Sequence, residues 1–287
     1  MDSGYDITVA YRVYPKVSKT PLVFKDNKYE LAKLCLKSFK DSVGSLKVKV
    51  FALLDKCPSE YEELFKQYFN EQDLNIIKLD GIGNLNTFSM QINILLNQSF
   101  SELIYFAEDD YFYLPNQFED MVKLLKENKD DSVHFVTPYD HLDFYTLDLH
   151  KHQVELKFTN NKHWKTSAST CLTFLTTKNV LQKTNRIFST YAIGNYDASL
   201  WLSLTKYKVF NIVDITKYYS RNKFLFDLIK SAYFMSWKQI FFGKRWKLWS
   251  PIPSIATHME VNYLAPAVNW EVIIDQSIQN SSNKSKS

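Results

Sequence analysis

Short apolar runs alternate with helical patterns along roughly the first third of the chain. Four runs are short and apolar enough to be buried strands: Ile7 to Tyr14, Val48 to Leu54, Leu74 to Leu79 and Leu103 to Ala107. After the first run, Leu31, Leu34, Cys35 and Phe39 repeat at helical spacing, and 86–96 also has a helical pattern. Strands that alternate with helices build a mainly parallel sheet with helices on both faces. The pattern therefore predicts a mixed α/β fold of the Rossmann type.

The alternation is less regular beyond residue 130. Four further strands are predicted there: Val133 to Thr137, Val154 to Phe158, Cys171 to Thr176 and Val209 to Ile215. Apolar residues at helical spacing predict helices over 177–187 and 196–204. The last residues, 276–287, are rich in Ser, Asn and Lys, and this composition predicts a disordered tail.

Three consecutive carboxylates follow the fourth apolar run. Glu108, Asp109 and Asp110 would lie at the carboxyl end of a strand, the edge where open α/β sheets bind ligands. Adjacent anions repel one another, and a hard divalent cation would compensate them. Protein carboxylates often hold Mg²⁺ while substrate phosphates complete its coordination. The cluster thus indicates a metal-bound nucleotide substrate, and a solvated acidic turn is the alternative.

The composition mainly excludes certain classes of protein and partner. A hydrophobic content of 45% in 287 residues is enough for a globular core, and a net charge of +4, spread along the chain, does not indicate a nucleic-acid partner. Cys35, Cys57 and Cys171 are odd in number and widely spaced, which argues against a disulfide framework and favours the cytoplasm. The chain lacks a signal-peptide pattern and any apolar run of about 18 residues, so neither export nor a membrane span is predicted.

The order of these features along the chain is itself informative. An opening strand, acids near position 110, a later acid at a helix start and a late histidine follow one another. This layout resembles the GT-A fold glycosyltransferases, family 2 in particular, over about residues 5–260. The resemblance implies one GT-A-like catalytic domain over 1–275, in which about 5–130 binds a nucleotide sugar and 131–275 binds the acceptor.

The resemblance also implies roles for the acids. Glu108-Asp109-Asp110 stands where the family has its DxD-type motif. Asp110 would then be the main ligand of Mn²⁺ or Mg²⁺, with Glu108 assisting and Asp109 nearer the ribose. His258 would bind the metal or the diphosphate. A structural role is the alternative for a histidine among apolar neighbours.

Donor recognition in such folds involves the end of the first strand and an acid after the second. By this resemblance Tyr11, Arg12 and Asp55 would contact the donor. Asn84 ends the segment Gly81-Ile-Gly-Asn84, whose glycines could bring the backbone close to the donor as well. Asp55 could instead be an ordinary turn acid. No Walker lysine follows a glycine-rich loop, so P-loop chemistry is not indicated.

Asp197 lies in the segment Asn195-Tyr-Asp-Ala-Ser-Leu-Trp201, which resembles the element that carries the family's catalytic base. The family has another acid directly before it, where this chain has Tyr196. The first turn of a helix favours a carboxylate because of the helix dipole. A helix cap is the alternative for Asp197.

Aromatic and basic residues are interleaved over 223–249. Such a segment could bind the anionic surface of a membrane from its inner face, which would suit a lipid-linked acceptor. A core helix whose lysines reach into solvent explains the same pattern.

Together these features predict an inverting, metal-dependent glycosyltransferase. It would move a sugar, from a UDP-sugar in the first instance, to a hydroxyl of a glycan or glycolipid acceptor. A non-catalytic carbohydrate- or nucleic-acid-binding module is one alternative, since aromatic and basic residues also suit such a role. A nucleotidyltransferase is another, although the sequence has no Gly-rich triphosphate loop.

Overall fold

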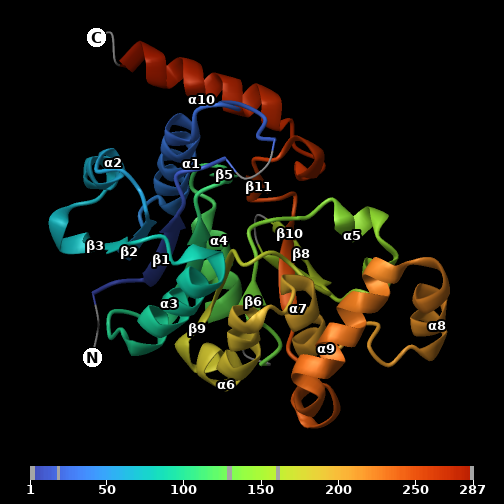
Figure 1. Cartoon of the computed structure of the whole chain (residues 1–287). Coiled ribbons are helices and arrows are strands. Elements are labelled where there is room, and N and C mark those ends of the chain that lie inside the picture. The colour runs from blue at the N-terminus through green and yellow to red at the C-terminus, as the bar shows by residue number, and fades with distance from the viewer. Residues whose placement is uncertain (1–3, 18–19, 128–130, 160–161, 285–287) are drawn as a thin grey trace.

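A computed structural model describes residues 4–17, 20–127, 131–159 and 162–284. In these residues, nine strands form one sheet in the order β3-β2-β1-β4-β9-β6-β10-β8-β7 (Figure 1). Their bounds are β1 Ile7–Val13, β2 Val48–Asp55, β3 Leu74–Leu79, β4 Leu103–Glu108, β6 Phe135–Val136, β7 Leu156–Thr159, β8 Lys162–Ser167, β9 Phe174–Thr177 and β10 Leu248–Ile252. Only β9 and β8 run opposite to the other described strands of this sheet.

Helices cover both faces of the sheet, as predicted. One face packs against α1 Lys28–Val43, α2 Glu60–Tyr68, α4 Phe118–Lys126 and α10 Trp270–Lys284. The other packs against α3 Gly83–Asn97, α6 Lys178–Phe188 and α7 Asp197–Thr205. The mixed α/β fold of the GT-A, Rossmann-like type is thus confirmed. The short helix α5 spans Asp143–Thr146, and single 3₁₀ turns span Glu71–Asp73, Asp148–His150, Ser189–Ile193 and Val261–Tyr263.

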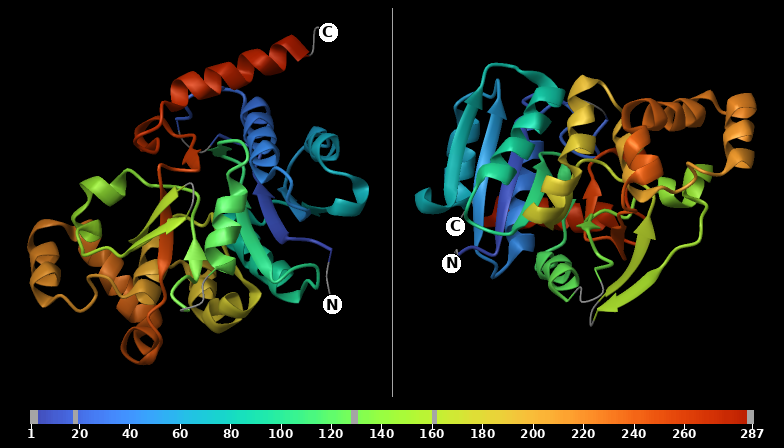
Figure 2. Two further views of the ribbon diagram at one scale, coloured as in Figure 1. Left: turned by 180° about the vertical axis from the view of Figure 1, so that it is seen from behind. Right: turned by 90° about the horizontal axis from the view of Figure 1, so that it is seen from below.

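Two further helices form an outer layer on α7. They are α8 Ile212–Arg221 and α9 Lys223–Phe242, and their inner sides share a separate apolar cluster with α7. Both views of Figure 2 place this pair at the end of the molecule opposite to β2 and β3. None of the helices in the described ranges is long and apolar enough to cross a membrane.

The first half of the sheet aligns the ends of its strands. β1 is buried along its whole length and pairs in parallel with β2 and with β4. In this register Arg12 lies beside Leu53 on one side and Glu108 on the other. The carboxyl ends of these strands therefore meet at one edge, where the residues predicted to bind ligands lie.

A small second sheet extends the acid cluster. Directly after Asp110, the strand β5 Tyr111–Tyr113 pairs antiparallel with β11 Ala256–His258. The register places His258 beside Tyr111, so the late histidine lies next to the acids. The aromatic run after Asp110 predicted no strand, because three residues are too few for a recognisable period.

The predicted strand over Val209–Ile215 is wrong. Ile212 begins α8 instead, and the side chain of Asn211 accepts a hydrogen bond from the backbone N–H of Asp214 at 3.1 Å. A short apolar run is compatible with a strand or a helix, and here the Asn211 cap stabilises the helix.

The predicted disordered tail is also wrong where the structure describes it. α10 continues as helix to Lys284, and the remaining three residues of the predicted tail lie outside the described ranges. Trp270 and Ile274 on the first turns of α10 are buried in the core that also contains α1. This burial anchors a helix that the polar composition of its end did not indicate.

Candidate active site

A cleft of about 650 Å³ opens at the carboxyl ends of β1, β2 and β4. Of the residues predicted to bind the donor, its lining contains Arg12, Asp55, Asn84 and Asp109. Asp110 and Glu108 also line it, so the structure brings the acid cluster and most of the predicted donor residues together. The cleft lies where open α/β sheets bind their ligands.

Tyr11 is the exception among the predicted donor residues. Its side chain is 1% exposed and packs edge-on against Phe39 and Phe65, with ring centroids 5.5 and 5.4 Å away. Successive side chains of a strand point to opposite faces, so Tyr11 enters the core while Arg12 reaches the cleft. The prediction that Tyr11 contacts a donor is therefore wrong.

Glu108 is held by two neighbours. One carboxylate oxygen forms an ion pair with the Arg12 guanidinium, and the other accepts a 2.7 Å hydrogen bond from the Thr173 hydroxyl. Arg12 also donates to the side-chain oxygen of Asn84. Burial lowers the pKa of Arg12, but the charge of Glu108 outweighs it and the net pKa is raised. Glu108 thus acts in this structure as the partner of Arg12.

Asp109 pairs with a lysine from α1. The Nζ atom of Lys28 lies 2.9 Å from one carboxylate oxygen, and the backbone N–H of Tyr14 donates to the other at 3.0 Å. Burial is the largest influence on Asp109 and raises the pKa of its carboxyl, while the charge of Lys28 opposes it. The pair is almost fully buried at the floor of the cleft, so each charge depends on the other.

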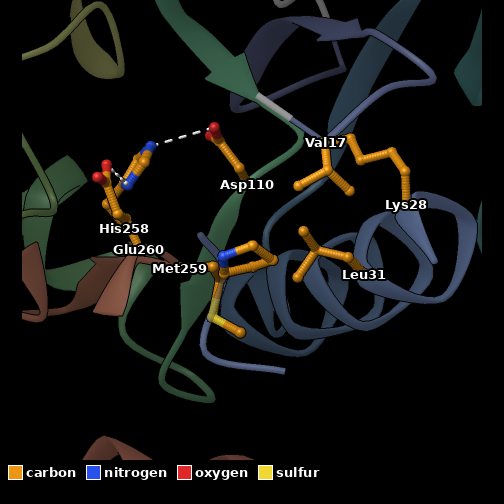
Figure 3. Close-up of a pocket in the computed structure, with 8 residues that line it drawn as sticks. Val17, Lys28, Leu31, Asp110, His258, Met259 and Glu260 are labelled. Carbon is orange, nitrogen blue, oxygen red and sulfur yellow. Dashed lines mark hydrogen bonds and ion pairs between the residues drawn. The ribbon is translucent and has the colours of Figure 1, made fainter. Parts of the chain in front are cut away.

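Asp110 and His258 face each other in a small pocket that shares Asp110 and Lys28 with the cleft (Figure 3). The Nε2 atom of His258 lies 3.1 Å from Oδ2 of Asp110, and the backbone N–H of Met259 donates to the Asp110 carbonyl at 2.8 Å. Burial raises the pKa of Asp110, but the neighbouring His258 and the hydrogen bond between them bring the net pKa below its usual range. Asp110 is therefore an anion.

One oxygen of Asp110 is unusual. Oδ1 is buried and has no hydrogen-bond partner among the described residues. A buried carboxylate oxygen rarely stays unpaired, because losing its water costs about 1–3 kcal/mol or more. A divalent cation would satisfy it, since carboxylate oxygens and imidazole nitrogens are ligands of Mn²⁺.

Asp110 and His258 together fit a metal ion that is completed by phosphate and water. Within the described ranges, no group of three or more His, Cys, Asp or Glu side chains is arranged to hold a metal. A site with two protein ligands matches the usual mode for phosphate-bound divalent ions. Both carboxylate oxygens of Glu108 have protein partners, which argues against direct coordination, and assistance through water stays a prediction.

Asp55 organises the loop before α3. Its carboxylate accepts hydrogen bonds from the backbone N–H groups of Gly81, Ile82 and Gly83 at 2.8, 2.9 and 2.9 Å. Gly81 and Gly83 have φ angles of 81° and 80°, a left-handed conformation that favours glycine. Asp55 thus fixes the wall of the cleft from which Asn84 projects, and its carboxylate is occupied by the loop.

Asp197 occupies the first position of α7, and Tyr196 is the capping residue. The Asp197 carboxylate nevertheless accepts a hydrogen bond from the backbone N–H of Ala198 at 2.6 Å, so a capping role at the helix start stays the alternative to a catalytic base. Burial raises the pKa of the Cys171 thiol, and the negative charges of Asp197 and Glu108 raise it further. Cys171 therefore lies near both the predicted base and the acid cluster. The indole of Trp201 on α7 donates to the Cys171 carbonyl at 3.3 Å, which ties this helix to the segment before β9. Asp197 itself is not among the residues that line the cleft.

Sequence reasoning missed three residues of the site: Lys28, Thr173 and Tyr191. Lys28 carried a readable signal, since it shares a helical face with Leu31 and Cys35, and a lysine on an apolar face usually has a buried partner. Thr173 and Tyr191 gave no such signal. Their contacts, to Glu108 and to the side chain of Asn84 at 2.8 Å, arise from distant segments.

Comparison with known families decides the relationship. The model of the family "Glycosyl transferase family 2" matches residues 27–194, more than half of the chain, including the acid cluster. This chain belongs to glycosyl transferase family 2. No curated protein sequence matches it. The matched segment contains most of the residues that line the cleft, whereas Arg12 precedes it and Asp197 and His258 follow it.

Solved structures show distant similarity. TarS from S. aureus with UDP-GlcNAc is 13% identical to this chain, with a TM-score of 0.43, and the match covers 65% of this chain and 53% of TarS. The mannosyltransferase PcManGT from Pyrobaculum calidifontis with GDP-Man and Mn²⁺ is 12% identical, with a TM-score of 0.41, and the match covers 72% of this chain and 54% of PcManGT. A 4-diphosphocytidyl-2C-methyl-D-erythritol synthase from Anaerococcus prevotii is 11% identical, with a TM-score of 0.42, and the match covers 72% of this chain and 85% of the synthase. The chain spans about a third of full TarS and about half of PcManGT.

Proposed function

We propose that this member of glycosyl transferase family 2 is a metal-dependent, inverting glycosyltransferase. It would take its sugar from a nucleotide-diphosphate sugar, a UDP-sugar in the first instance, and transfer it to a hydroxyl of a glycan or lipid-linked acceptor. The observation that carries the proposal is Asp110, whose buried Oδ1 has no partner among the described residues and whose other oxygen faces His258.

Asp110 and His258 would hold Mn²⁺ or Mg²⁺. When bound, the ion would neutralise charge that develops on the departing nucleoside diphosphate. The protein adds its own cations, because Arg12, Lys28 and Lys56 line the same cleft. Arg12 and Lys28 are fixed by Glu108 and Asp109, so they would need little reorganisation as charge develops.

The two halves of the chain would bind different substrates. The cleft is built within about 5–130, which we assign to the donor. Asn84 and Asp109 line it and would contact the nucleoside side of the donor, while Asp55 would act by holding the Gly81–Gly83 loop. The part from 131 to 275 would then bind the acceptor, and it contains Asp197.

Asp197 would act as the general base on the acceptor. Its carboxylate would take the proton of the acceptor hydroxyl as that oxygen bonds to the anomeric carbon. The bond from the anomeric carbon to the diphosphate oxygen breaks at the same time, and the diphosphate leaves with its electron pair. One direct displacement of this kind inverts the anomeric centre, and a positioned base contributes roughly 10²- to 10⁴-fold to its rate.

Calorimetry of UDP binding tests the proposal, with Mn²⁺ present and with a chelator in its place. Tight binding is expected only with the metal. Release of sugar from a panel of nucleotide sugars with Mn²⁺ then identifies the donor. If UDP binding is indifferent to the chelator and no nucleotide sugar is turned over, a non-catalytic binding module becomes the better explanation.

A further inference from the structure

The outer sides of α8 and α9 expose an unusual amount of apolar surface. We call it the α8–α9 surface and define it by seven apolar residues whose exposed fractions lie between 49% and 81%: Phe210, Ile212, Val213, Phe234, Trp237, Phe241 and Phe242. Monomeric soluble proteins rarely expose large apolar side chains in such density, and a patch of this kind usually marks an interaction site.

Ring contacts show that this surface is continuous across the two helices. Phe210, before α8, lies 5.8 Å from Phe241 near the end of α9, measured between ring centroids. Phe242 lies 6.3 Å from Phe241 and 6.3 Å from Trp237. The start of α8 and the end of α9 therefore present one aromatic ridge. Figure 1 shows both segments at the outer corner of the molecule.

The same region carries the positive charge of the protein. Residues 206–245 contain nine basic and two acidic residues, a net charge of +7, whereas the whole chain carries +4. The charge is thus concentrated here and is not spread along the chain as the composition suggested. Both acids are already paired, Asp214 with Lys208 at 2.7 Å and Asp227 with Lys223 at 2.7 Å.

Basic groups lie directly beside the apolar ridge. The ammonium group of Lys238 lies 5.5 Å from the ring of Trp237, and Lys217 and Arg221 share the outer groove of α8 with Ile212 and Val213. Phe210 lines an open pocket of about 410 Å³ together with lysines that include Lys206 and Lys208. Apolar side chains that project from a basic surface fit a sheet of anionic headgroups over acyl chains.

We propose that the α8–α9 surface binds an anionic lipid bilayer. Charge complementarity favours this occupant over a second copy of the chain, because two surfaces of net charge +7 would repel one another. The aromatic ridge would enter the interface while the lysines contact the headgroups. Attachment would be peripheral, since none of the described helices can span the membrane.

The helix α9, which forms part of the α8–α9 surface, also contacts the start of α7, where the proposed acceptor site lies. The hydroxyl of Ser231 on α9 donates to the side-chain oxygen of Asn195 at 2.8 Å, two residues before Asp197. The hydroxyl of Ser199 on α7 donates to the carbonyl of Leu228 at 2.8 Å. Bilayer binding would thus place the first turn of α7 near lipid-linked acceptors. This last consequence rests on the proposed function, whereas bilayer binding does not.

Co-sedimentation with vesicles tests the proposal on the full chain. The wild type is expected to sediment with vesicles of phosphatidylcholine and phosphatidylglycerol at low salt, and much less with phosphatidylcholine alone. Val213→Asp with Phe242→Asp should weaken binding at least about 10-fold, because two apolar side chains leave the interface. Arg221→Glu with Lys238→Glu should do the same and reduce the salt dependence, since each basic group contributes near a charged surface.

Phe158→Asp is the matched control. Phe158 is an aromatic residue of β7 with 67% exposure, outside the α8–α9 surface, so vesicle binding should stay as in the wild type. Arg245 is not a suitable test residue, because its guanidinium donates to the Thr205 carbonyl at 2.8 Å and packs on Tyr207. Thermal melts and UDP calorimetry show whether each variant is folded, and unchanged values are expected.

Three results would overturn the proposal. One is wild-type protein that ignores anionic vesicles at low salt. Another is vesicle binding by both double variants that equals that of Phe158→Asp. The third is a dimer in analytical ultracentrifugation that Val213→Asp with Phe242→Asp dissolves, because the surface would then join two copies. Loss of sugar transfer with normal vesicle binding would instead count only against the proposed function.

Discussion

The Nε2 atom of His258 lies 3.1 Å from Oδ2 of Asp110, although 148 residues separate them in the chain. The contact depends on the pairing of β11 with β5, which places His258 beside Tyr111 directly after the acid. The pair lines a small pocket that shares Asp110 with the cleft, and it leaves the other oxygen of Asp110 for a ligand.

Asp110→Asn should lower metal-dependent turnover of the donor at least about 10²-fold, since the amide keeps the shape and removes the ligand charge. Turnover at limiting Mn²⁺ measures this. Asp41→Asn is the control, because Asp41 is an exposed acid paired with Lys37 on α1 and should leave turnover unchanged. Wild-type turnover in the Asp110 variant would remove the acid from the metal site.

His258→Ala should weaken the binding of Mn²⁺ with UDP by about 10-fold or more if the imidazole is a ligand. Calorimetry gives the affinity, and melts with and without the ligands give the stabilisation that binding adds. A variant that melts at a lower temperature but keeps the full ligand-induced shift would show that His258 only packs against Tyr111.

Asp197→Asn should leave the Kd of the donor within about 2-fold and cut transfer about 10²- to 10⁴-fold, because a general base acts on the acceptor. Asp214→Asn is a matched control, since Asp214 also lies in the first turn of a helix. Full transfer by the Asp197 amide would defeat the catalytic assignment. Asp140, which pairs with Lys165 at 2.9 Å, would be the next acid to test.

Lys28→Met should destabilise the fold by about 3–5 kcal/mol, because it leaves the carboxylate of Asp109 buried beside Asp110 without its cation. Urea unfolding at neutral pH measures the loss. Adding Asp109→Asn should restore much of the stability, since the amide no longer needs a counter-charge. If the double variant is no more stable than Lys28→Met, the cost comes from lost packing and not from the unpaired charge.

His134 should make the protein less stable as the pH falls. Burial, the largest cause, lowers the pKa of His134 from 6.5 to about 4, and its Nδ1 accepts a hydrogen bond from the backbone N–H of Lys247 at 3.0 Å. Between these two values the unfolded chain binds a proton that the folded chain does not. Stability therefore falls with decreasing pH by up to about 1.4 kcal/mol per pH unit.

His134→Gln should remove that part of the pH dependence, because glutamine can accept the hydrogen bond and does not titrate. Urea unfolding at several pH values between about 4 and 6.5 gives the slope for both proteins. Equal slopes for the variant and the wild type would assign the acid sensitivity to other groups, such as His150, whose pKa burial also lowers.

The local pattern of the sequence determined much of the first half of the fold. Leu74–Leu79 is a strand with the predicted bounds, and Ile7–Val13 and Val48–Asp55 differ from prediction by one residue each. Strand and helix periods are properties of a few neighbouring residues, so they can be read without knowing the partners. The same reasoning placed the acid cluster at a strand end.

Only the tertiary structure decided the partners. Trp249 is fully buried in β10, which lies between β6 and β8 in the central sheet, yet the aromatic and basic pattern around it predicted no strand. Glu108 forms an ion pair with Arg12 because the register of β1 with β4 places the two residues side by side. Lys28 forms an ion pair with Asp109 because α1 packs beside the end of β4. Such contacts join residues far apart in sequence, and local periodicity contains no information about them.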